Sequence, residues 1–73
     1  MNYHNFYQDI ADWINNVNQL ATTHEFGSSE FWEHVMRSAG EVSDKYDNQE
    51  IVHRQFEMLI DWLQGIYNKQ IER

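Results

Sequence analysis

The first apolar residues of the chain recur at helical spacing. Between Asn2 and Thr22 they fall on positions a, d and e of three successive heptads: Tyr3, Phe6, Tyr7, Ile10, Trp13, Ile14, Val17, Leu20 and Ala21. This spacing gathers the side chains in one stripe along a helix. We therefore predict an amphipathic helix over residues 2–22. Gly27, in the segment that follows, can adopt the left-handed conformation that ends a helix. Ser28 or Ser29 can cap the next helix.

Two further segments show the same periodicity. Over residues 29–46 the a and d positions are Trp32, Val35, Ala39, Val42 and Tyr46, flanked by Phe31 and Met36. Over residues 49–71 the stripe is Val52, Phe56, Leu59, Ile60, Leu63, Ile66 and Tyr67. Each pattern predicts a helix with one apolar side. The small residues Ser38, Ala39 and Gly40 also predict that a neighbouring helix approaches closely at that point of the second helix.

These three patterns indicate an all-α fold, an antiparallel three-helix bundle. One alternative stays open, because no Gly or Pro lies between Glu41 and Gln64. Residues 29–72 would then form one long helix, and the resulting hairpin would dimerise into a four-helix bundle. The adjacent poor helix formers Asp47 and Asn48 favour the three-helix interpretation.

The length and composition narrow the class of protein. Seventy-three residues form at most one domain, so we expect residues 1–73 to be a single helical domain. The chain has no Cys, which excludes disulfides and thiolate metal sites. It has no apolar run near the ~20 residues that span a bilayer, and its first residues do not resemble a signal peptide. We therefore expect a cytoplasmic protein.

The formal charge is −7, and it is unevenly distributed. Residues 1–36 contain five acids and neither Lys nor Arg, whereas residues 37–73 contain seven acids and all five bases. Nucleic-acid binders need cations to neutralise phosphates, so direct nucleic-acid binding is not expected, nor is binding to an anionic membrane. The acidic half would instead attract a basic partner protein.

Four acids stand at helical spacing on the second predicted helix: Glu30, Glu33, Glu41 and Asp44. Their E-x-x-E and E-x-x-D spacing resembles the paired Mg²⁺ motifs of the MazG-like nucleotide pyrophosphohydrolases, in which the two motifs lie on separate helices. Here both motifs lie on one helix, which places Glu33 and Glu41 ~12 Å apart at ~1.5 Å per residue. Carboxylates so far apart cannot share one ion, so we exclude that metal site. The acids are either a solvated face, paired with Arg37 and Lys45 at i,i+4 spacing, or a surface that recognises a partner.

No other motif indicates catalysis or a cofactor. Glu50 and His53 form a single E-x-x-H, whereas a di-iron bundle needs two copies and two further Glu residues. No phosphate-binding glycine loop or nucleophile elbow is present in the sequence. We therefore expect a protein that is not an enzyme and that needs no metal or cofactor.

The third predicted helix has a second apolar side. Ile51, Met58 and Trp62 lie ~100° from its main stripe at ~100° per residue. Either they widen the core of a central helix, or they form a homodimer or partner interface, where Trp and Met are enriched. These residues suggest a non-catalytic module for protein–protein interaction or self-association. The alternative function is an acidic decoy that occupies the basic nucleic-acid-binding surface of a partner. Small phage-encoded or immunity-type proteins can act in that way, and a bacterial or phage origin is our expectation.

Overall fold

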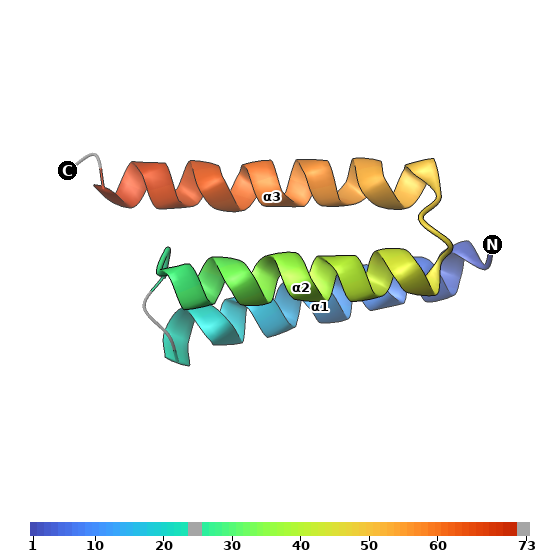
Figure 1. Cartoon of the computed structure of the whole chain (residues 1–73), viewed down its shortest axis with the longest axis horizontal. Coiled ribbons are helices and arrows are strands. Elements are labelled where there is room, and N and C mark those ends of the chain that lie inside the picture. Colours follow the sequence, from blue (N-terminus) through green and yellow to red (C-terminus); the bar gives the residue numbers. More distant parts are fainter. Residues whose placement is uncertain (24–25, 72–73) are drawn as a thin grey trace.

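The computed structural model describes residues 1–23 and 26–71, and the regular structure in these residues is entirely helical. Helix α1 spans Tyr3–Thr23, α2 spans Ser29–Lys45 and α3 spans Glu50–Ile71. The three helices lie side by side in an elongated bundle of 42 × 20 × 18 Å (Figure 1). The predicted all-α class, the three helices and their approximate bounds are confirmed.

The start of α2 has the predicted capping residues. Gly27 has a φ of 83°, in the left-handed region that costs glycine little. Ser28 is the N-cap of α2, and its hydroxyl accepts a hydrogen bond from the Phe31 N–H at 3.2 Å. That bond satisfies one of the N–H groups that the first turn leaves without an intrahelical partner.

The turn between α2 and α3 interrupts the proposed long helix. Asp47 and Asn48 have φ values of 58° and 55°, which no α-helix accommodates. The Asn48 N–H donates to the Ser43 carbonyl at 2.8 Å. A hydrogen bond between residues five apart in sequence is typical of a Schellman-type helix end. The alternative of one helix over residues 29–72 is therefore wrong. Short polar side chains tolerate left-handed backbone, so the two poor helix formers terminate α2.

A single core lies between the helices. Its buried residues are Phe6, Ile10, Trp13 and Val17 from α1, Phe31, Val35 and Ala39 from α2, and Val52, Phe56, Leu59 and Leu63 from α3. The predicted stripes of α1 and α3 supply most of this core.

The stripe of α2 is rotated from the prediction. Phe31, which we expected to flank the core, is fully buried, and Trp32 and Val42 are only partly buried. Tyr3 and Tyr7 of the α1 stripe are 58% and 46% exposed. A heptad pattern fixes a stripe only to within about one neighbouring position, and the two partner helices decide which edge of the stripe is covered.

Among the described residues, no helix combines the length and the apolar character needed to cross a membrane.

Candidate functional site

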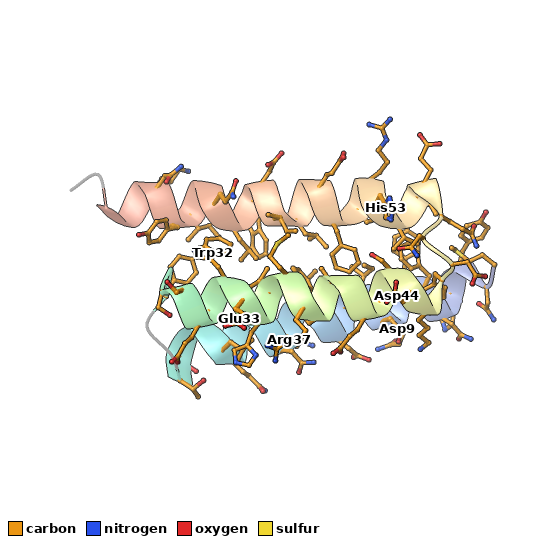
Figure 2. The ribbon with its side chains drawn as sticks, viewed as in Figure 1. Asp9, Trp32, Glu33, Arg37, Asp44 and His53 are labelled. Carbon is orange, nitrogen blue, oxygen red and sulfur yellow. The ribbon has the colours of Figure 1, made fainter. Side chains whose placement is uncertain are left out.

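The four acids of α2 are all exposed. Glu33 forms the predicted ion pair with Arg37 at 3.1 Å, and both side chains are more than half exposed. Asp44 accepts a hydrogen bond from the Asn48 side chain at 3.4 Å. Glu33, Arg37 and Asp44 are seen along the outer side of α2 in Figure 2. An exposed i,i+4 pair adds only about 0.3–0.5 kcal/mol, so these acids contribute charge to the surface more than stability.

Lys45 does not use its predicted partner Glu41. Its ammonium group instead contacts the Asp9 carboxylate of α1 at 2.8 Å, and the Tyr46 hydroxyl donates to the same oxygen. Sequence spacing gave no sign of this cluster, because its members are 36 and 37 residues apart and meet only when α1 and α2 pack.

The cluster of Asp9, Lys45 and Tyr46 has the electrostatics of a structural tie. Hydrogen bonds from Lys45 and then Tyr46 lower the pKa of Asp9 below its ordinary value. Lys45 and Tyr46 each donate a hydrogen bond to Asp9, and each bond raises the pKa of its donor. A catalytic carboxylate base or lysine would need shifts in the opposite directions, toward neutral pH. The arrangement therefore favours fixed charges that join two helices.

Glu50 and His53, the E-x-x-H pair, each contact a residue close to them in sequence. Glu50 forms an ion pair with Arg54 at 3.3 Å, and a ring nitrogen of His53 lies 3.4 Å from the Asn48 side-chain oxygen. Within residues 1–23 and 26–71, no three His, Cys, Asp or Glu side chains are grouped so that they would hold a metal ion.

The predicted second side of α3 is divided by its exposure. Ile51 is partly buried and packs against the core, whereas Met58 is 57% and Trp62 44% exposed. Gln55, one turn before Met58, donates to the Tyr7 hydroxyl of α1 at 3.5 Å. Tyr3 and Tyr7 therefore border the same surface. We call this surface the α1/α3 face and define it as Tyr3, Tyr7, Ile51, Met58 and Trp62. The sequence did not reveal that the two tyrosines join it, because α1 alone places them in the core stripe.

The α1/α3 face lacks negative charge along its two helical stripes. On α1 the stripe continues from Tyr7 to Ala11 and Ile14, and on α3 it runs through Ile51, Gln55, Met58 and Trp62. Neither stripe contains Asp or Glu, although the chain has twelve such residues. An exposed apolar surface of this kind typically marks an interaction site.

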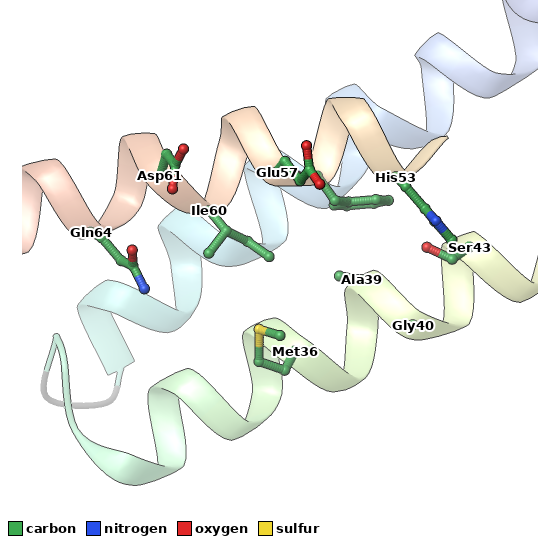
Figure 3. A pocket seen from close by; sticks show the side chains of 10 residues that line it. Met36, Ala39, Gly40, Ser43, His53, Glu57, Ile60, Asp61 and Gln64 are labelled. Atoms are coloured by element: carbon green, nitrogen blue, oxygen red, sulfur yellow. The ribbon is translucent and has the colours of Figure 1, made fainter. Parts of the chain in front are cut away.

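A groove of about 710 Å³ lies between α2 and α3, on the side of α3 opposite the α1/α3 face. We call it the α2/α3 groove, and Figure 3 shows it from close by. Its lining residues are Met36, Ala39, Gly40 and Ser43 from α2 and His53, Phe56, Glu57, Ile60, Asp61 and Gln64 from α3.

At Gly40 the structure does not show the predicted close helix approach. A Cβ placed on Gly40 would have no heavy atom of another residue within 4 Å, and Ala39 and Gly40 line the groove. Ser38 lies on the side toward α1, where its hydroxyl accepts a 2.8 Å hydrogen bond from the Trp13 indole N–H. Small side chains opposite the larger Phe56 and Ile60 thus leave a gap between the helices and do not close it.

No protein-family model matches this chain, and the searches of curated proteins and of solved structures gave no significant match.

Proposed function

We propose that this protein is a small, non-catalytic helical module that self-associates through the α1/α3 face. The observation that carries the proposal is the exposure of Tyr3, Tyr7, Met58 and Trp62, each between 44% and 58%, along two neighbouring helices. Aromatic residues and Met are enriched at protein interfaces because they bury a large area with few polar atoms.

Charge favours this face over other parts of the surface as the contact between copies. Two copies of a chain with a net charge of −7 repel each other. A contact through stripes that lack Asp and Glu brings no carboxylates together. Burial of apolar area there would supply about 25 cal/mol per Å² before the costs of association are subtracted.

We also propose that residues 1–73 form one domain, an antiparallel three-helix bundle, in solution. The contacts between neighbouring helices support the antiparallel arrangement. Asp9, early in α1, meets Lys45, late in α2, whereas Trp13 meets the earlier Ser38. Trp32, early in α2, packs edge-on against Tyr67, late in α3, with ring centroids 6.3 Å apart.

The test is a dissociation constant for the dimer, measured by sedimentation equilibrium, of the wild type and of Trp62→Ala and Met58→Ser. A central Trp anchor typically contributes 2 kcal/mol or more, so we expect Trp62→Ala to weaken self-association about 30-fold. Met36→Ser is the matched control, because Met36 and Met58 are both 57% exposed but lie on different faces. The thermal unfolding of both Met variants should stay near that of the wild type.

Two results would contradict the proposal. The first is a wild type that stays monomeric at millimolar concentration. The second is a Met36→Ser variant that weakens association as much as Met58→Ser does.

The acidic decoy remains the alternative prediction, and its basis is the acid-rich, cation-free segment of residues 1–36. Salt distinguishes the two. Added salt screens the repulsion between copies, so apolar self-association should stay the same or become stronger. Added salt should weaken the binding of a basic partner, because exposed charges are screened beyond a Debye length of ~8–10 Å.

A further inference from the structure

The α2/α3 groove has an apolar floor that no described part of the chain covers. Ala39 and Phe56 form buried parts of the floor, Ile60 is partly buried, and Met36 beside it is 57% exposed. In Figure 3 the side chains of Met36 and Ile60 project into the gap between the two helices. From His53 to Gln64 the groove extends ~17 Å along α3 at ~1.5 Å per residue. It is long enough for three turns of a helix.

The α3 side of the groove is negative. There the exposed Glu57 and Asp61 stand one turn apart, and both line the groove. Glu57 forms an ion pair with Arg54 at 3.9 Å. Among the described residues, Asp61 forms no ion pair. A ligand in the groove would therefore meet an uncompensated carboxylate on the α3 wall.

We infer that the α2/α3 groove binds an amphipathic helical segment of a partner protein, with bulky apolar residues on one side and Lys or Arg along the edge that faces α3. A Leu-sized side chain would fill the space above Gly40 and contact Ile60 and Met36. Cationic residues about one turn away would reach Asp61 and Glu57. Burial of one apolar helix face in a groove is a recurrent mode of peptide recognition, and the flanking charges set its specificity.

Charge complementarity selects this occupant. A second copy that docked through its own groove would bring the negative α3 side of that groove with it, and nucleic acid would bring phosphates, so both would be repelled. Self-association through the α1/α3 face leaves the groove open, because that face lies on the opposite flank of α3.

The direct test is fluorescence anisotropy with a synthetic helical peptide of about 15 Leu and Lys residues in amphipathic order. Two peptides serve as comparisons: a Leu/Glu peptide of the same pattern, and a Leu/Lys peptide of the same composition in scrambled order. We expect the amphipathic Leu/Lys peptide to bind at least ~10-fold more tightly than either. Equal binding of the scrambled peptide would overturn the proposal, because only non-specific charge attraction would then remain.

The groove is tested by Gly40→Leu, which places a side chain in the space that the ligand needs. Gly65→Leu is the matched control, because Gly65 is also a glycine of a helix interior with no heavy atom within 4 Å of its added Cβ, and it does not line the groove. Both variants should fold, since neither position is crowded. We expect Gly40→Leu to weaken peptide binding at least ~10-fold and Gly65→Leu to leave it unchanged. Unchanged binding in both variants, or equal loss in both, would overturn the proposal.

A titration of Trp62→Ala with the same peptide separates this site from the proposed dimer contact. Unchanged affinity would support the groove as the site, whether or not the wild type self-associates. A large loss of affinity would place the peptide on the α1/α3 face and overturn the assignment to the groove.

Discussion

Helices α1 and α2 are joined by specific polar contacts, whereas α3 is held mainly by apolar ones. Asp9 receives one hydrogen bond from Lys45 of α2 and one from Tyr46, the C-cap of α2, and the Trp13 indole donates to Ser38. Between α3 and the other helices, the side-chain hydrogen bond described is the long 3.5 Å bond from Gln55 to Tyr7. Rings supply the contact instead, such as Trp13 against Phe56 at 5.1 Å and 79°.

This difference has a consequence for function. Polar ties fix the register of α1 against α2, because each donor needs a particular acceptor. Large rings keep α3 at a distance from its neighbours, and both of its flanks stay accessible. One flank is the apolar α1/α3 face and the other is the α2/α3 groove. Both of the proposed binding sites thus lie beside the helix that is least tied to the rest.

The largest expected effect comes from breaking the apolar attachment of α3. Phe56 is 5% exposed, and Phe56→Ala should reduce the free energy of unfolding by about 3–5 kcal/mol. A core of this size supplies little more than that in total, so most of the variant should be unfolded at room temperature. Far-ultraviolet circular dichroism during urea unfolding measures the loss. Met36→Ala is the control and should stay within about 0.5 kcal/mol of the wild type. A Phe56→Ala variant with wild-type stability would contradict the apolar attachment described here.

An intermediate effect is expected at the contact between Gly27 and the far end of α3. A Cβ on Gly27 would overlap the Tyr67 ring, and the φ of 83° is itself unfavourable for other residues. The backbone conformation alone costs alanine about 1–2 kcal/mol, and the ring must also move. We expect Gly27→Ala to lower stability by about 1–3 kcal/mol in thermal and urea unfolding.

Gly65→Ala provides the comparison for Gly27→Ala. The added methyl group meets no neighbour, and alanine is favoured over glycine inside a helix by about 0.5–1 kcal/mol. The two glycine variants should therefore change stability in opposite directions. Equal stability of Gly27→Ala and the wild type would show that Tyr67 does not close over this turn.

The smallest effect concerns the polar tie of α1 and α2, and it depends on pH. The pKa of Asp9 is lowered in the folded protein, so its contribution is fully present above the unfolded value of ~3.9 and is lost as the pH falls through the folded value. The pKa values of Lys45 and Tyr46 are raised, so their contribution is present below ~10 and is lost as the pH rises through the folded values. Asp9→Asn should lower the melting temperature most between these limits and least at low pH.

Thermal unfolding followed by circular dichroism from strongly acidic to strongly alkaline pH measures this difference. Asp12→Asn, an exposed acid one turn along α1, is the control and should change the melting temperature less. An Asp9→Asn effect of constant size across the whole pH range would contradict an electrostatic tie.

The candidate surfaces were only partly predictable from the sequence. Met58 and Trp62 were identified because they depart from the main stripe of their own helix, which is a local property. Tyr3 and Tyr7 were assigned to the core, since a single helix cannot indicate which edge of its stripe a partner leaves uncovered. The groove beside Gly40 contradicts the prediction of a close helix approach at that residue. Small residues permit a close approach, but the Phe56 and Ile60 side chains opposite them decide the distance.

The sequence by itself determined the three helices, their approximate ends, an N-cap at Ser28 or Ser29 and the uneven charge. These features follow from local causes: helical periodicity, capping chemistry, and the left-handed backbone that Gly27, Asp47 and Asn48 accept. Only the tertiary structure decided that Lys45 meets Asp9, that Phe31 replaces Trp32 in the core, and that a groove opens beside Gly40. Each of these depends on which side chains of separate helices come face to face. That choice is made by the packing of the whole core, and no spacing within one helix encodes it.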